Sequence, residues 1–404
     1  MDPFLAHAQT HQPALVRFLR ALVECESPSD DAAAVNRCAD LFADSVADIA
    51  KVKSIAGGHY GRHLICDFNL PGKRKEGLVL GLGHTDTVYP LGTVKQMPWR
   101  EAEGRYWGPG VLDMKAGLAF FVFAMRALRD LDIPVRRRVR LLLVSEEEVG
   151  SPVSRPLTEK TATGATAVLV LEPGTGLAGK LKTARKGIGG YTVKVTGHAA
   201  HAGVDFTQGA SAIVELAHQI QRIAGFTNLA KGTTVNPGVI EGGTRSNVIA
   251  AHAQTDVDFR IARLRDFTPL DKQFRKLKAV NPRCTISIEG GLNRPPMERT
   301  REIGALFSLA RRLAIDLGVQ LEESSTGGGS DGNFTAALGV PTLDGLGAVG
   351  EGAHAPHESI LIDRIADRTA LLAKLVAALS VGPASRPVFG GIGTFHQPAR
   401  LIPF

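Results

Sequence analysis

The fold of this chain is limited first by three short, almost wholly apolar runs, at residues 78–82, 139–144 and 167–171. Polar residues bound each run. Residues 115–131, between the first two runs, have the apolar spacing of a helix, as do residues 12–23 and 31–50. Strands that are buried on both faces have this composition, and they occur in parallel sheets covered by helices. We therefore expect an α/β fold with a mostly parallel sheet.

A chain of 404 residues exceeds what one hydrophobic core usually organises, and its pattern changes near residue 187. The order expected from there is β-α-β-β-α-β, which matches a ferredoxin-like α+β unit. Its expected elements are strands at 190–195, 233–240, 247–261 and 284–289 and helices at 210–223 and 270–280. The α/β pattern resumes after Pro295 and Pro296. We predict an α/β domain at 1–186 and 299–404, interrupted by a domain at 187–298, with a Gly/Pro-rich tail at 382–404.

Composition and charge exclude several classes of protein. The net charge of +7 is small for this length, and the densest basic run, at residues 136–140, directly precedes an apolar run. A solvated start of a strand explains it better than a nucleic-acid site. The N-terminal residues lack a secretory signal pattern, and no apolar run approaches a membrane span, so a cytoplasmic location is expected. Four cysteines without CxxC spacing predict neither a disulfide framework nor a thiolate metal site.

Acidic residues and histidines follow the predicted strands. His84 and Asp86 come after the first run, residues 146–148 are three glutamates after the second, and Glu172 follows the third. His354 follows a later predicted strand at 341–346. Open α/β sheets bind ligands at the carboxyl ends of their strands, so these side chains are expected to converge.

Carboxylates together with imidazoles form a ligand set for a divalent metal such as zinc. Asp113, at a turn that opens a predicted helix, is placed to bridge two ions. Two metals would activate a shared water and polarise a carbonyl, while a further carboxylate from 146–148 takes the proton. Each element alone has an ordinary explanation as a surface histidine or a solvated turn. Their joint occurrence favours a metal site, because like charges this close are costly without cations.

Five segments, at 83–88, 108–117, 145–151, 171–174 and 352–354, resemble in this order the motifs of the M20 family of metallopeptidases. The resemblance covers residues 12–380 and is strongest to the glutamate carboxypeptidase (carboxypeptidase G2-like) branch. It implies a catalytic α/β domain with an inserted ferredoxin-like dimerisation (lid) domain. It also implies two divalent metal ions, with zinc expected from the ligand types. His84 and Glu172 would bind one ion, Glu148 and His354 the other, and Asp113 would lie between them.

The same resemblance assigns the remaining roles near the metals. Glu147 would be the general base, Asp86 would hydrogen-bond the far nitrogen of His84, and the peptide bond between Asp113 and Met114 would be cis. His357 stands where many family members have asparagine, so it remains an alternative to His354 as a ligand.

The inserted domain supplies a second set of residues. The pattern at 197–203 implies that His201 stabilises the oxyanion in the active site of the partner subunit, in a homodimer formed through 187–298. The positions that match family substrate contacts are Lys180, Asn247, Arg260 and Arg294. Gly328 and Gly329 belong to a Gly-rich turn that lacks the phosphate-loop pattern and could present backbone N–H groups to a substrate carboxylate.

Together these residues predict a two-metal hydrolase that releases a C-terminal amino acid, with glutamate as the first expectation, from a small peptide or N-acyl amino acid. Cations around the pocket suit a substrate with one or two carboxylates. The alternative is an N-acyl-amino-acid deacylase of the acetylornithine deacetylase or aminoacylase type, with the same metal chemistry. A non-enzymatic binding protein is disfavoured, because all five ligand positions and the base position are filled by competent residues.

Overall fold

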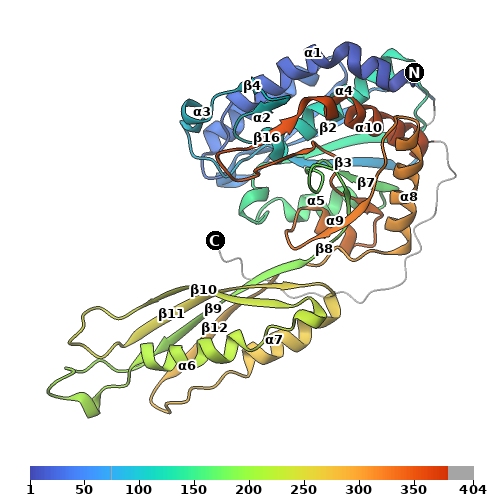
Figure 1. Cartoon of the computed structure of the whole chain (residues 1–404). Coiled ribbons are helices and arrows are strands. Elements are labelled where there is room, and N and C mark those ends of the chain that lie inside the picture. The colour runs from blue at the N-terminus through green and yellow to red at the C-terminus, as the bar shows by residue number, and fades with distance from the viewer. Residues whose placement is uncertain (74, 381–404) are drawn as a thin grey trace.

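The computed structural model describes residues 1–73 and 75–380. The predicted tail at 382–404 lies outside the described residues. Figure 1 shows a larger part built from the two ends of the described chain and a smaller part built from its middle. The strands β8 (Leu181–Arg185) and β9 (Gly187–Thr196) lead from the larger part into the smaller one.

A six-stranded sheet forms the centre of the larger part, in the order β1-β2-β6-β3-β7-β14. Its strands are β1 (Ala50–Ala56), β2 (Arg62–Phe68), β3 (Leu78–His84), β6 (Arg138–Val144), β7 (Ala167–Val170) and β14 (Thr342–Leu343). The pairs β6–β3, β3–β7 and β7–β14 are parallel, whereas β2 is antiparallel to both β1 and β6. The sheet is thus mostly parallel, and the three apolar runs occupy its adjacent central strands.

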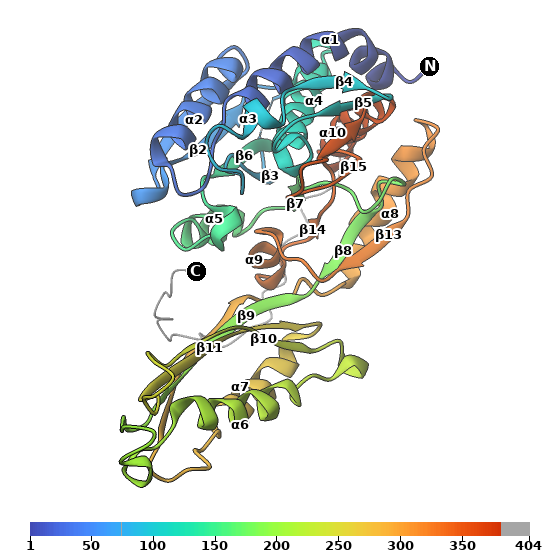
Figure 2. The same ribbon diagram turned by 60° about the vertical axis from the view of Figure 1, so that its left-hand side comes forward.

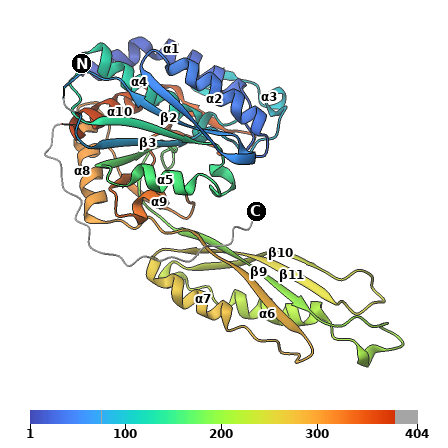
Figure 3. The same ribbon diagram turned by 180° about the vertical axis from the view of Figure 1, so that it is seen from behind.

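Helices cover both faces of this sheet, because successive side chains along the central strands point to opposite sides. Leu141 and Leu143 face the larger core with α1, α2, α4, α8 and α10, while Leu142 and Val144 face a smaller core that includes Ala162 of α5. Figure 3 shows α1, α2, α4 and α10 on one side and α5 and α9 on the other. The bounds of these helices are α1 (Pro3–Glu24), α2 (Ala32–Val46), α4 (Ala116–Asp130), α5 (Arg155–Ala162), α8 (Arg301–Ile315), α9 (Gly332–Ala337) and α10 (Ile365–Leu379). No helix in the described ranges is long and apolar enough to cross a bilayer.

Two helix predictions were wrong at one end. The helix expected at 12–23 begins at Pro3, because the side chain of Asp2 accepts the N–H groups of Phe4 and Leu5 at 2.9 and 3.2 Å and caps it. The helix expected at 31–50 ends at Val46, since residues 50–56 form the strand β1.

Short strands complete the larger part. A four-stranded sheet consists of β4 (Arg100–Ala102), β5 (Arg105–Trp107), β15 (Gly350–Glu351) and β16 (Ser359–Leu361), in the order β15-β16-β5-β4. The strand β13 (Glu323–Thr326) pairs in parallel with β8. A single turn of helix, α3 (Thr93–Gln96), lies between β3 and β4. The loop between β15 and β16 carries His354.

The smaller part is a four-stranded antiparallel sheet with two helices on one face (Figure 2). Its elements follow β9 in the order α6 (Ala212–Ala224), β10 (Thr234–Gly242), β11 (His252–Ile261), α7 (Phe267–Arg275) and β12 (Thr285–Arg294). The strand order β10-β11-β9-β12 is the arrangement expected of a ferredoxin-like unit. Tyr191, Phe259 and Phe274 stack within its own core. The division at 187 and 298 stays a prediction, which this separate sheet and core support.

Candidate metal centre

The predicted ligands lie at the carboxyl ends of the central strands and in two turns beside them. His84 ends β3, Glu148 lies in the short 3₁₀ turn that follows β6, and Glu172 lies two residues beyond β7. Asp113 lies in the turn before α4, and His354 lies in the β15–β16 loop. The parallel arrangement of the strands brings these side chains to one edge of the sheet.

Asp113 is the centre of this arrangement. Its Oδ1 lies 3.2 Å from Nε2 of His84, and the same nitrogen lies 3.6 Å from Oε1 of Glu172. Its Oδ2 lies 3.3 Å from Nε2 of His354, which lies 3.2 Å from Oε1 of Glu148. The carboxylate therefore faces two histidines, each of which has a second carboxylate beside it. The geometry places His354, the residue favoured over His357, against both acids.

Asp86 and Ser29 hold the His84 ring in place. Nδ1 of His84 lies 3.0 Å from the backbone oxygen of Asp86 and 3.4 Å from its Oδ1. The buried Asp86 carboxylate accepts hydrogen bonds from Ser29 Oγ at 2.6 Å and from the N–H of Glu148 at 3.1 Å. Burial alone would raise the pKa of Asp86, but its bonds with His84, Ser29 and Glu148 lower it. Nε2 of His84 is thereby left as the nitrogen that faces Asp113.

The turn that carries Asp113 is held by Glu358. Its carboxylate, 1% exposed, accepts the N–H groups of Gly110 at 2.9 Å, Leu112 at 2.8 Å and Asp113 at 2.9 Å. The peptide bond between Asp113 and Met114 is cis, as the resemblance implied. Glu358 was not predicted as a site residue. One signal could have pointed to it, because Glu358 directly follows His357, the alternative ligand.

The crowded carboxylates favour positive charge at this edge. Hydrogen bonds to Asp113 and Glu148 raise the pKa of His354 to about 11, against the opposing effect of burial. Burial raises the pKa of Glu148 to about 8, and the nearby charges of Asp113 and Glu147 act in the same direction. The carboxylates of Asp113, Glu148 and Glu172 are thus held together by the imidazoles of His84 and His354. Metal cations can take over this role.

Glu147 differs from Glu148 in its partner. Its Oε1 accepts a hydrogen bond of 2.8 Å from Nη2 of Arg294, which also bonds Oδ1 of Asp331 at 2.9 Å and Oγ of Ser151 at 3.0 Å. Burial raises the pKa of Glu147, while the charge of Arg294 lowers it. One oxygen of Glu147 also lies within 4.8 Å of ligand atoms of His84 and Glu172. Glu147 is thus beside the predicted ligands and tied to a guanidinium.

Arg294 reaches the site as a buried side chain, and its role as a substrate contact stays a prediction. It is 4% exposed, and its guanidinium is engaged by the Glu147 and Asp331 carboxylates. Arg260 lies nearer the surface, where Nε bonds both oxygens of Asp258 and Nη1 lies 3.3 Å from the Gly327 oxygen.

The Gly-rich turn meets an arginine that the sequence did not single out. Arg185, at the end of β8, donates to the backbone oxygens of Gly328 and Gly329 at 3.1 and 2.9 Å. It also forms a two-bond pair with Asp344, at 2.8 and 2.9 Å, and lies 4.0 Å from Glu172. The carbonyls of the two glycines therefore point to a protein cation. Their predicted role as N–H donors to substrate stays a prediction.

Lys180 is paired with an acid of its own chain. Its Nζ lies 2.5 Å from Oε2 of Glu322, and its side chain is 40% exposed. Lys180 directly precedes β8, which ends at Arg185. Its role as a substrate contact stays a prediction.

His201 and Asn247 lie together, away from the ligands of their own chain. Both are exposed and belong to loops at the end of the second sheet that points away from the larger part (Figures 1 and 2). Ala202 donates its N–H to the backbone oxygen of Asn247 at 3.0 Å, and His201 and Val248 form an isolated antiparallel β-bridge. Within one subunit the length of β9, about 30 Å, lies between the larger part and the loop that carries His201.

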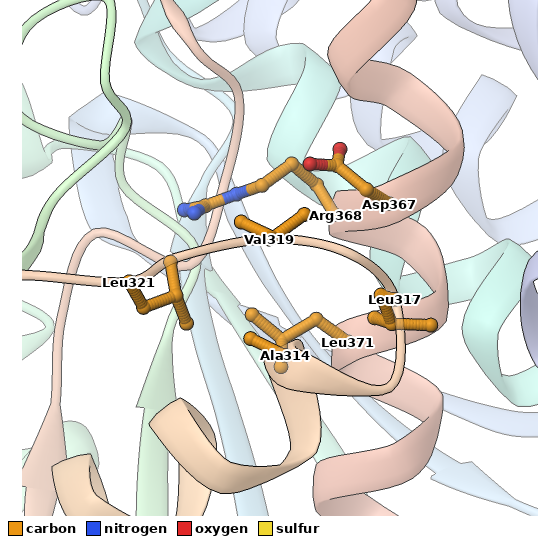
Figure 4. Close-up of a pocket in the computed structure, with 7 residues that line it drawn as sticks. All are labelled: Ala314, Leu317, Val319, Leu321, Asp367, Arg368 and Leu371. Atoms are coloured by element: carbon orange, nitrogen blue, oxygen red, sulfur yellow. The ribbon is translucent and has the colours of Figure 1, made fainter.

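The loop after Glu172 is anchored to α10 by Arg368. Figure 4 shows this side chain extending beside Val319 and Leu321, with Asp367 next to it. Arg368 donates to the backbone oxygens of Gly179 at 3.0 Å and Gly347 at 2.9 Å, and also to that of Gly345. Since Gly347 in turn donates its N–H to the Glu172 oxygen at 2.8 Å, α10 supports a predicted ligand through the backbone.

The profile described as peptidase family M20/M25/M40 matches residues 81–378. The chain belongs to this family. It is 29% identical over 392 residues to carboxypeptidase G2 of Pseudomonas sp. (strain RS-16), covering 94% of this chain and 93% of that protein. It is therefore an M20 peptidase related to carboxypeptidase G2.

Two solved structures show the same fold. Aminopeptidase PepT from Bacillus cereus ATCC 10987 has a TM-score of 0.77 at 23% identity, covering 91% of this chain and 98% of that chain. The YxeP protein of Bacillus subtilis, described as a dinuclear metal binding peptidase from the M20 family, has a TM-score of 0.68 at 14% identity, covering 92% and 99%.

Proposed function

We propose that this M20 peptidase is a two-metal amide hydrolase that releases a C-terminal amino acid, glutamate first, from a small peptide or N-acyl amino acid. One observation carries the proposal. The two oxygens of Asp113 face different histidines, 3.2 and 3.3 Å away, and each histidine has a further carboxylate next to it. This is the arrangement that one carboxylate shared by two ions requires.

The residues present fit a pair of zinc ions. Each half of the cluster offers one imidazole and one carboxylate besides Asp113, which are ligand types that zinc accepts. Asp86 fixes the His84 ring through Nδ1, as outer partners of metal-bound histidines do. The described likeness to a dinuclear metal binding peptidase supports the same number of ions.

The chain's own residues would then divide the work of hydrolysis. When bound, the two ions would activate a water and polarise the scissile carbonyl. Glu147 would accept a proton from the water and pass it to the leaving amine. Arg294 would orient the Glu147 carboxylate through the 2.8 Å hydrogen bond, and its charge opposes the rise in the pKa of Glu147 that burial causes.

A second subunit would complete the site. We infer a homodimer through residues 187–298, in which His201 and Asn247 of one chain reach the metal centre of the other. Their common position at the far end of the second sheet supports this, because they are exposed and lie away from their own centre. His201 would bind the developing oxyanion, and Asn247 the substrate.

Glutamate is proposed as the released residue on two grounds. The chain is related along nearly its whole length to carboxypeptidase G2. Arg185, Arg260 and Arg294 all lie near the Gly-rich turn at 327–329, and a guanidinium suits a substrate carboxylate, although carboxylates of this chain already pair with all three. Arg260 is the most accessible of the three and is the candidate for direct contact.

Metal removal and a substrate panel test this proposal together. Chelation should abolish hydrolysis, and added Zn²⁺, Co²⁺ or Mn²⁺ should restore it at two ions per chain. N-acyl-glutamate should be cleaved faster than N-acyl-ornithine or N-acyl-leucine. Full activity after complete removal of metal would refute the two-metal centre, and a preference for N-acyl-ornithine would favour the deacylase alternative.

A further inference from the structure

Two histidines and an aspartate meet where the start of α1 lies against the end of α4. His7 and His11 are four residues apart on α1, and Asp130 is the last residue of α4. One ligand atom from each of the three lies within 4.8 Å of the others. This cluster, the α1–α4 histidine cluster, is separate from the metal centre, because α4 carries the chain about 21 Å from the turn at Asp113 to Asp130.

The backbone fixes the orientation of His11. Its Nδ1 lies 2.9 Å from the backbone oxygen of His7, and a carbonyl oxygen can only accept a hydrogen bond. Nδ1 therefore carries the proton, which leaves the lone pair on Nε2. The rings of His7 and His11 stack with centroids 3.9 Å apart and planes at 21°, so they project side by side from the helix.

Asp130 provides the third donor from a different helix. Its Oδ2 lies 3.0 Å from Nε2 of His7, whose side chain is 7% exposed. Its Oδ1 is bonded to Nε of Arg129 at 2.8 Å, which steadies the carboxylate but places one positive charge nearby. Asp130 is 33% exposed, so the cluster is open to ions from solvent.

We propose that His7, His11 and Asp130 bind a divalent zinc-type ion that ties the start of α1 to the end of α4. Two imidazoles and one carboxylate leave a fourth position for water, a ligand set that zinc accepts. Ligand atoms around one zinc ion are about 3.3 Å apart, so small side-chain rotations suffice to close the cluster. The proposal is independent of the catalytic function.

Zinc binding to substituted proteins tests this site. His11→Ala and Asp130→Asn each remove one ligand at a partly or fully accessible position. His59→Ala is the matched control, since His59 is exposed in the turn Gly58–Tyr60 of the larger part. At saturating Zn²⁺, equilibrium dialysis should find one ion more per chain in the wild type and in His59→Ala than in the other two variants. The added ion should raise the unfolding midpoint of the wild type and of His59→Ala alone, while amide hydrolysis stays unchanged in all four proteins.

The difference in zinc content, rather than the total, decides the outcome. A failure of the two-metal centre would lower the total in all four proteins and leave the difference intact. Equal zinc content in the wild type, His11→Ala and Asp130→Asn would overturn the proposal, and the contact between His7 and Asp130 would then be an ordinary hydrogen bond.

Discussion

Glu147 and Glu148 are neighbours in sequence that differ in what balances their charge. Glu148 lies 3.2 Å from His354, whereas Glu147 lies 2.8 Å from Arg294. An arginine keeps its proton at any pH at which the protein is folded, so it cannot be displaced from its carboxylate by deprotonation. A metal ion can replace the proton on a histidine and then also be coordinated by the adjacent carboxylate. This difference supports the proposed coordination by Glu148 and the proposed proton transfer by Glu147.

Substitution of each glutamate by glutamine should separate the two roles. Glu147→Gln should lower kcat by about 10²–10⁴-fold with metal content unchanged, because general-base catalysis contributes that much. Glu148→Gln should lose bound metal. Elemental analysis beside kinetics checks both, and loss of metal in Glu147→Gln with normal content in Glu148→Gln would reverse the assignment.

Arg294 should contribute to stability as well as to catalysis. Replacement by glutamine leaves Glu147 and Asp331 without their buried cation, which costs about 3–5 kcal/mol of unfolding free energy. Arg260→Gln is the matched control, since Arg260 pairs with Asp258 near the surface and its loss costs about 0–1 kcal/mol. Denaturant unfolding measures both, and equal costs for the two variants would contradict a buried role for Arg294.

Glu358 supports the turn from Gly110 to Asp113 as an N-cap residue supports a helix, by accepting backbone N–H groups of the turn. Glu358→Ala would leave three N–H groups without their acceptor and loosen the carboxylate that is proposed to bridge the ions. We expect metal affinity to fall about 10–100-fold, as for other outer-shell partners. A competition titration with a chelator measures this affinity.

The matched control is Glu351→Ala, which removes a half-exposed partner of Arg105 on the adjacent strand β15. Glu358→Gln should give an intermediate loss, because Oε1, which accepts from Leu112 and Asp113, can be replaced by the amide oxygen. Wild-type affinity in Glu358→Ala would show that the turn holds its shape without the carboxylate.

The elements that could be predicted from sequence are those whose burial leaves a continuous signal. The strands β3, β6 and β7 are mostly apolar because helices cover both faces of the sheet. Most residues of the outer strand β1 are exposed, so β1 has no continuous apolar run and was not predicted. The strands β15 and β16 are too short to show any period. His354 lies between the last two, so the sequence placed it only after a strand predicted at 341–346 and not in the loop between two short strands.

Residue roles that depend on pairing could not be predicted from position along the chain. Lys180 is close to Glu172 in sequence, yet β8 carries the chain about 16 Å between Lys180 and Arg185, and it is Arg185 that lies beside Glu172. Likewise the sequence indicated a cation at Arg294 but not that Glu147 and Asp331 would engage it. Side-chain partners from distant segments are set by tertiary packing, which no local pattern encodes.

At the scale of the whole molecule, the second sheet separates two halves of the proposed site. β9 begins next to the larger part and extends about 30 Å to the loop that carries His201. Apolar side chains are exposed on β10 at Val239 and Ile240, which are 52% and 59% exposed. An isologous contact between two copies would cover such a surface and bring each His201 to the other chain.

Mixing two inactive proteins tests whether this contact completes the site. Glu147→Gln lacks the base, and His201→Ala lacks the oxyanion donor, whose loss typically costs about 10²–10³-fold in turnover. In a mixed dimer one site combines an intact Glu147 with an intact His201 from the partner. Equal mixing with free subunit exchange should therefore restore about a quarter of wild-type activity, since half of the symmetric dimers become mixed and each gains one site. Differently tagged subunits verify the exchange. The control is a chain that carries both substitutions, which should restore no activity when it is mixed with either single variant. If exchange is complete and the mixture stays inactive, His201 has no role in the partner's site.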